Sequence, residues 1–105
     1  MKTSDIEVIV IGELLIDMIA DNPGTQMEFQ TSFTRYPGGA PANFAVNVKR
    51  LGINSGVITK IGDDFFGRFL IDTLKKENVD TSRIFQPKFP MLLYIFVVLC
   101  LCFFL

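Results

Sequence analysis

The sequence has 105 residues, half of them hydrophobic, and a formal net charge of −1. The length allows at most one domain, and the charge gives no electrostatic reason to expect nucleic acid as a partner. There is no histidine, so the commonest general base and the commonest metal ligand are absent from this chain.

The N-terminal third of the sequence predicts a strand followed by a hairpin. Residues 6–11 are mostly β-branched and end at Gly12, which is typical of a strand buried on both faces of a parallel sheet. Segments 15–20 and 29–36 flank the turn signal Asp21-Asn22-Pro23-Gly24, and we expect them to pair and project from the sheet. The residues before the first strand lack the apolar run of a signal peptide, which favours a cytoplasmic protein.

Two glycines lead into a helix at residues 37–43, which read Pro-Gly-Gly-Ala-Pro-Ala-Asn. Glycine permits a positive φ and a close approach of backbone to a ligand, and proline is favoured in a first helical turn. The free N–H groups of that turn and the Asn43 amide suit a hydroxyl-rich ligand or an anion. The alternative is an ordinary strand-to-helix turn, because short glycine motifs also occur without a ligand.

The helix that begins there is predicted to run over residues 41–51 and to end at Gly52. Apolar side chains nearly encircle it, so we expect it to be largely buried. Asn43, Asn47 and Arg50 form one narrow polar stripe along it. Buried amides need hydrogen-bond partners, so this stripe should meet another part of the protein or a ligand.

A second strand and a second helix follow. Residues 55–61 predict the strand, and residues 65–77 carry the apolar spacing of an amphipathic helix, with Asp64 as its N-cap. The order strand, hairpin, helix, strand, helix is typical of the opening of an α/β fold with a parallel sheet.

Three motifs lie where these elements join, at residues 12–17 (Gly-Glu-Leu-Leu-Ile-Asp), 38–43 and 60–67 (Lys-Ile-Gly-Asp-Asp-Phe-Phe-Gly). In parallel sheets, loops of this kind converge at the carboxyl ends of the strands, where ligands bind. Over about residues 6–85 the series resembles the N-terminal part of the PfkB (ribokinase-like) carbohydrate kinases, and is closest to the fructokinases. The resemblance implies a ribokinase-like, Rossmann-type parallel sheet with a small β-hairpin lid, of which only the N-terminal third is present.

The resemblance also implies part of a sugar site. Asp17 would accept hydrogen bonds from sugar hydroxyls, Gly38 and Gly39 would let the backbone close on the sugar, and Asn43 would bond another hydroxyl. The hairpin would be part of the lid that excludes water. Each residue has a structural alternative: Asp17 as a solvated strand-end acid, and Asn43 as a capping or buried amide.

Three further acidic residues are weaker candidates. Glu13 could orient the substrate loop or simply be solvated. Asp63 and Asp64 are interpreted as turn and cap residues rather than metal ligands, because no spaced series of carboxylates follows them. We therefore predict no metal site in this chain.

No catalytic residue is assigned. In the resembled family a Gly-Ala-Gly-Asp motif near the C-terminus supplies the anion hole and the aspartate base, and that motif does not occur here. ATP and Mg²⁺ are expected for the full-length family, whose members often dimerise through the lid. We predict that this chain alone binds no nucleotide and does not phosphorylate sugar.

Composition divides the chain into two parts, residues 1–88 as a partial kinase domain and residues 89–105 as a divergent apolar tail. From Met91 onward there is no charged side chain, and both cysteines, Cys100 and Cys102, lie there. As a helix, residues 91–105 would span only about 22 Å of a hydrocarbon core of about 30 Å. We favour a truncated product whose exposed apolar surface weakens its stability, over a membrane-anchored protein.

Three functions remain open at this stage. The first is a fragment of an ATP-dependent sugar kinase, with fructose as the sugar. The second is a fragment of a PfkB kinase for ribose, ketodeoxygluconate or a nucleoside. The third is a non-catalytic scaffold or tail-anchored interaction protein with a kinase-like body.

Overall fold

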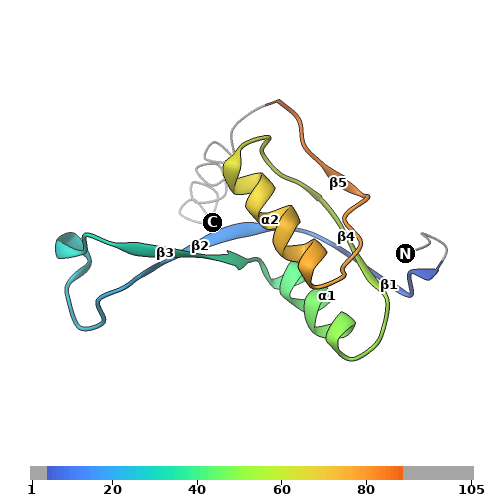
Figure 1. Cartoon of the computed structure of the whole chain (residues 1–105), viewed down its shortest axis with the longest axis horizontal. Coiled ribbons are helices and arrows are strands. Elements are labelled where there is room, and N and C mark those ends of the chain that lie inside the picture. The colour runs from blue at the N-terminus through green and yellow to red at the C-terminus, as the bar shows by residue number, and fades with distance from the viewer. Residues whose placement is uncertain (1–4, 89–105) are drawn as a thin grey trace, which may run out of the picture.

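The structure is a computed structural model, and it describes residues 5–88. Two parts are visible in Figure 1: an α/β body and a long ribbon that projects from it. In chain order the elements are β1 (Val8–Ile11), β2 (Leu15–Ala20), the 3₁₀ helix η2 (Met27–Phe29), β3 (Phe33–Gly38), α1 (Ala40–Arg50), β4 (Ser55–Lys60), α2 (Phe65–Lys76) and β5 (Ile84–Phe85). The predicted order of strand, hairpin, helix, strand, helix is confirmed.

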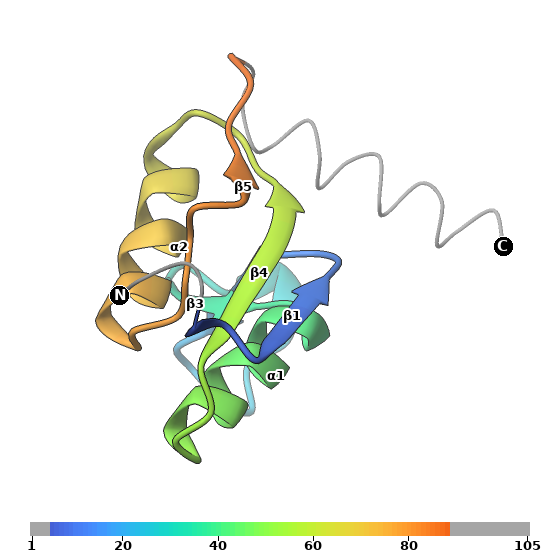
Figure 2. The ribbon, with the colours of Figure 1, turned by 90° about the vertical axis from the view of Figure 1, so that its right-hand side faces the viewer.

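Three parallel strands form the sheet of the body, in the order β1-β4-β5 (Figure 2). Each connection between neighbouring strands carries one helix, α1 between β1 and β4 and α2 between β4 and β5. β5 was not predicted from the sequence. It has two residues, and it is defined by their parallel pairing with Thr59 and Lys60 of β4.

The projecting ribbon is the predicted hairpin. Its strands β2 and β3 are antiparallel, and their pairing runs from Leu15 opposite Gly38 to Ala20 opposite Phe33. The second strand begins at Phe33 rather than at the predicted residue 29, because η2 occupies residues 27–29. The Gln30 side chain closes this loop by donating to the carbonyl oxygens of Asn22 at 2.7 Å and Thr25 at 2.9 Å.

One hydrophobic core joins the two helices, β4 and the base of the ribbon. Its fully buried members are Leu14, Val57, Ile61, Leu70 and Leu74, with Ala42 and Ala45 on the inner side of α1. Ser55 is a buried polar residue, and its hydroxyl is satisfied because it donates to the Ala45 carbonyl oxygen at 2.7 Å.

Two burial predictions are wrong. β1 is buried on one face only, since Ile9 and Ile11 are 43% and 74% exposed. α1 is not largely buried either, because only its two inner alanines are buried and Phe44 is 55% exposed. Both β1 and α1 are apolar as the sequence indicates. Within residues 5–88, however, other elements cover only one face of the sheet and one side of α1.

No helix within residues 5–88 combines the length and the apolar content that crossing a bilayer requires. The apolar tail, in which the sequence analysis placed a possible anchor, lies outside the described residues.

Candidate functional site

Two loops pack backbone to backbone at the point where the ribbon joins the body. Gly39 is the N-cap of α1 with φ +101°, and a Cβ built on it would collide with the carbonyl oxygen of Glu13. A Cβ built on Gly12 would lie 2.5 Å from Cγ of Pro41. The glycines therefore let the loop after β1 and the start of α1 approach more closely than any side chain would allow.

Asp17 lies directly against Gly38. A Cβ on Gly38 would be 2.6 Å from Cγ of Asp17 and 2.8 Å from its Oδ1. Gly38 does not have a positive φ, so its requirement for glycine is spatial rather than conformational. The pairing of β2 with β3 thus brings the Asp17 carboxylate against Gly38, although these residues are 21 positions apart in the sequence.

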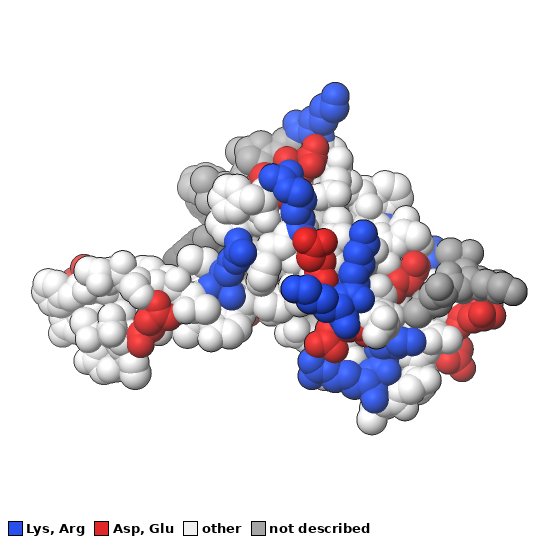
Figure 3. All heavy atoms as spheres, viewed as in Figure 1, with Lys and Arg blue, Asp and Glu red and all other residues white. Residues whose placement is uncertain are grey.

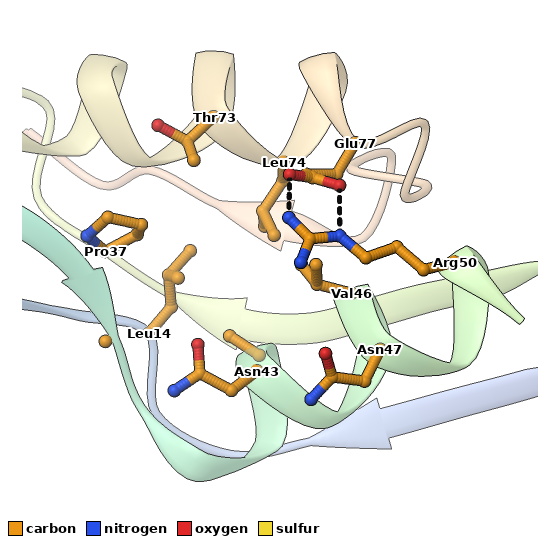
Figure 4. A pocket seen from close by; sticks show the side chains of 11 residues that line it. Leu14, Pro37, Asn43, Val46, Asn47, Arg50, Thr73, Leu74 and Glu77 are labelled. Carbon is orange, nitrogen blue, oxygen red and sulfur yellow. Dashed lines mark hydrogen bonds and ion pairs between the residues drawn. The ribbon is translucent and has the colours of Figure 1, made fainter.

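Asn43 lies in the first turn of α1. Its backbone N–H donates to the Gly39 carbonyl oxygen at 3.0 Å, and its side chain is exposed. Figure 4 shows it beside Asn47 on the wall of a cavity of about 320 Å³ between α1, α2 and the base of the ribbon. The predicted polar stripe therefore lines a cavity. Asn43, Asn47 and Arg50 thus face α2 and the base of the ribbon across this cavity.

That cavity and the Asp17 carboxylate lie on different faces of the ribbon. Asp17 pairs with Tyr36, whereas the cavity wall contains Pro37, whose partner is Ile16. Tyr36 and Pro37 are neighbours in β3, so their side chains point to opposite faces of the ribbon. Asp17 shares the face of its partner Tyr36, and the Asp17 and Pro37 side chains therefore point in opposite directions. Of the four predicted site residues, Gly38 and Asn43 line this cavity, while Asp17 and Gly39 do not.

A second cavity lies at the carboxyl ends of the parallel strands. Its volume is about 600 Å³, and its lining residues are Ile11, Gly12, Glu13, Leu15, Ile58, Thr59, Lys60 and Phe85. Leu15 and Asp17 are two residues apart in β2, so their side chains point to the same face of the ribbon. The Asp17 carboxylate therefore faces the same side as the strand ends, where ligands of parallel α/β sheets bind.

An ion pair closes the far end of the first cavity and was missed by the sequence analysis. Arg50 donates to Glu77 from Nε at 2.9 Å and from Nη2 at 2.5 Å, as the dashed lines in Figure 4 mark. Hydrogen bonding to Arg50 lowers the pKa of Glu77 below its ordinary value, and the same bonds raise the pKa of Arg50. The only available signal was the position of Arg50 at the end of the polar stripe.

The ribbon is also held against α2 by a contact that no local pattern predicts. The guanidinium carbon of Arg35 in β3 lies 4.2 Å from the ring centroid of Phe69 in α2, a cation–π geometry. Figure 3 shows Lys and Arg side chains gathered over α1 and α2.

Of the remaining acidic candidates, Glu13 lines the second cavity, whereas Asp64 and Asp63 make structural contacts. Asp64 caps α2, accepting a hydrogen bond from the Gly67 N–H at 2.9 Å, as predicted. Asp63 lies 3.9 Å from Arg68 in an exposed ion pair. Near the ribbon tip, Asp21 accepts hydrogen bonds from Ser32 and Thr34, which lower its pKa.

The parallel sheet, its helical crossovers and the antiparallel ribbon define the ribokinase-like class of α/β folds, in which the polar loops gather at one edge of the sheet. The sequence profile of the pfkB family carbohydrate kinases matches residues 5–88. The chain belongs to the PfkB family of carbohydrate kinases.

Known members of the family are similar over most of this chain. It is 49% identical over 84 residues to a protein of Arabidopsis thaliana named "Probable fructokinase-7", covering 78% of this chain and 24% of the relative. It is 40% identical over 83 residues to the 5-dehydro-2-deoxygluconokinase of Geobacillus thermodenitrificans, covering 79% of this chain and 25% of the relative. A sugar kinase structure from Pyrococcus horikoshii in complex with ATP is 50% identical with a TM-score of 0.72, covering 76% of this chain and 26% of that one. The chain thus spans about a quarter of the length of the curated relatives it matches.

Proposed function

We propose that residues 5–88 form the sugar-binding part of an ATP-dependent carbohydrate kinase, with fructose as the sugar. The observation that carries the proposal is the Asp17 carboxylate, which lies over Gly38 on the ribbon face that Leu15 shares. Leu15 in turn lines the cavity at the strand ends. A carboxylate is an acceptor only, so it can hold two adjacent hydroxyl groups of a sugar.

The neighbouring groups have different parts in this proposal. Gly38 leaves the space that the Asp17 carboxylate occupies, and Gly39 lets the start of α1 pack against the Glu13 backbone. The exposed Asn43 amide can both donate and accept a hydrogen bond, and it would bond a hydroxyl from the cavity on the other face of the ribbon. The ribbon would exclude water from the bound sugar. These roles bind and orient a substrate; none of them moves a phosphoryl group.

Phosphoryl transfer requires a nucleotide site, charge stabilisation at the transferred phosphate and a group that positions the nucleophile. A solved relative binds ATP, but no three Cys, Asp or Glu side chains of the described chain come together in a way that could hold a metal ion. We propose that ATP and its metal bind parts of a kinase outside this chain, and that these 105 residues alone transfer no phosphate.

Fructose is the preferred sugar in this proposal because a relative named as a fructokinase shares 49% identity and the loop at residues 38–43 reads Gly-Gly-Ala-Pro-Ala-Asn. The 40% identity to a 5-dehydro-2-deoxygluconokinase supports an acidic sugar derivative as the second candidate. Side-by-side titrations with the two sugars distinguish these specificities.

The test is a sugar titration of the 105-residue protein followed by ¹H–¹⁵N NMR. We expect fructose at millimolar concentration to shift the amide signals of Gly38, Gly39 and Asn43. Asp17→Asn should abolish the shifts, because it removes the negative charge and replaces one of the two acceptor oxygens with an NH₂ donor. The matched control is Asp72→Asn, an exposed carboxylate of α2 away from these loops. Equal shifts in wild type and Asp17→Asn, or no shifts with any sugar, would refute the sugar site.

We also propose that the protein is cytoplasmic and that copies associate through the ribbon, as the family resemblance implies. Large apolar side chains on both ribbon faces support association, since Met18, Ile19 and Tyr36 are each about half exposed. Sedimentation equilibrium of the wild type and of Ile19→Asp tests this: the substitution should lower the mass, and a monomeric wild type would contradict it. A scaffold without sugar binding is the alternative if the titration fails.

A further inference from the structure

The cavity between α1, α2 and the base of the ribbon has a second carboxamide besides that of Asn43. Asn47 lies one helical turn further along α1, and Figure 4 shows both carboxamides on the same wall. Both side chains are exposed, and among the cavity residues drawn neither carboxamide makes a hydrogen bond. Two amide groups, about 6 Å apart along the helix axis, are therefore open to one ligand in this cavity.

The rest of the cavity suits a small organic ligand. Leu14, Val46 and Leu74 contribute apolar surface beside the carboxamides, and the volume is about 320 Å³. Ligand pockets in proteins combine mostly apolar walls with a few polar groups that fix orientation, and they begin at about 300 Å³. The cavity therefore has the composition and the volume of a site for one small molecule, whose C–H groups would contact the apolar wall.

The charged groups of the cavity favour a neutral ligand. The lining contains one cation and one anion, Arg50 and Glu77, and their side chains bind each other through two hydrogen bonds. An anionic ligand would have to displace the Glu77 carboxylate from Arg50 and would then lie beside a second negative charge. A hydroxyl group, by contrast, both donates and accepts a hydrogen bond, as each carboxamide does. The wall therefore matches a neutral polyol.

We propose that Asn47 is a second sugar-binding residue of this cavity, and that the cavity selects a neutral sugar over an acidic one. The inference rests on the proposed function, in which Asn43 bonds a sugar hydroxyl from the same cavity. Because the two asparagines are one turn apart, each would hold a different hydroxyl of one sugar. The pair of Arg50 with Glu77 would disfavour a sugar acid, since it leaves the cavity lining without net charge.

Fructose titrations of the 105-residue protein, followed by the side-chain NH₂ signals of Asn43 and Asn47 in ¹H–¹⁵N NMR spectra, test the role of Asn47. We expect fructose to shift both signals with one dissociation constant. Asn47→Ala should raise that constant about two- to tenfold, measured on the Asn43 signal, because one hydrogen bond is lost. Alanine is the better helix former, so α1 should stay intact. The matched control is Asn22→Ala, an exposed asparagine in the loop at the ribbon tip, which should bind fructose like the wild type.

Gluconate titrations test the selection of a neutral sugar. In the wild type we expect gluconate to leave both side-chain signals in place at concentrations where fructose shifts them. Glu77→Gln removes the negative charge and frees Arg50 for another anion, so this variant should gain gluconate binding.

Equal fructose affinities of the wild type and Asn47→Ala would overturn the role of Asn47, and so would an equal loss of affinity in Asn22→Ala. Either result would leave the proposed function in place, because that function depends on Asp17 and is measured by Asp17→Asn. Equal shifts with gluconate and fructose in the wild type would overturn the selection of a neutral sugar. Absence of shifts with every sugar would refute the proposed function and this inference together.

Discussion

Gly39 offers a quantitative test of the loop packing that builds the candidate site. Replacing it by alanine imposes two costs. The positive φ of +101° strains any side chain, and the new Cβ would lie 3.1 Å from the Glu13 carbonyl carbon and 3.3 Å from Cα of Leu14. Backbone strain of this kind costs about 1–3 kcal/mol, and overpacking against backbone that cannot rotate away adds about 1–3 kcal/mol.

Gly52→Ala is the matched control because it separates the two costs. Gly52 has a similar φ of +92°, but a Cβ there would meet nothing within 4 Å. It should therefore show the strain alone, about 1–3 kcal/mol. Gly38→Ala is the reverse case: its φ is not positive, and its Cβ meets a side chain that can rotate, so we expect a loss of only about 0.5–1.5 kcal/mol.

The assay is equilibrium urea unfolding followed by far-UV circular dichroism, since the chain contains no tryptophan. With a slope of about 1 kcal/mol per molar urea, Gly39→Ala should unfold about 1–3 M earlier than Gly52→Ala. Equal midpoints for the two variants would refute the close packing of the loops. A larger loss for Gly38→Ala than for Gly39→Ala would refute the distinction between side-chain and backbone contacts.

Three further predictions use the same assay. Asp64→Ala should lower the free energy of unfolding by about 0.5–2 kcal/mol by removing the N-cap of α2, and Asp64→Asn should retain most of it; equal losses would exclude a capping role. Leu74→Ala should cost about 2–5 kcal/mol because the side chain is fully buried, and a loss near zero would contradict the core as described. The lowered pKa of Glu77 means that its pair with Arg50 stabilises the fold above the ordinary carboxylate pKa of 4.5, and that this contribution is lost as the pH falls through the lower, folded-state value. Glu77→Gln should therefore lower stability at pH 7 and leave it nearly unchanged at pH 2; a pH-independent difference would refute the ion pair as its cause.

Local signals in the sequence were sufficient for the elements with strong patterns. Gly39 and Pro41 fixed the start of α1, Asp64 fixed the start of α2, and the turn at residues 21–24 fixed the ribbon. Each of these features depends on residues within a few positions of one another. The two residues of β5 carried no such signal, because that strand is defined only by pairing with β4.

The candidate site likewise combines features that the local sequence determines with features that only the tertiary structure determines. The sequence alone determined which residues to consider and where the polar loops begin, because glycine, proline and asparagine have local backbone consequences. Only the tertiary structure decided that Asp17 lies against Gly38, that Arg50 pairs with Glu77, and that the outer face of β1 is open. Those facts depend on strand register and on which elements cover which face. Strand register and the covering of a face both involve residues far apart in the chain, so no local sequence pattern predicts them.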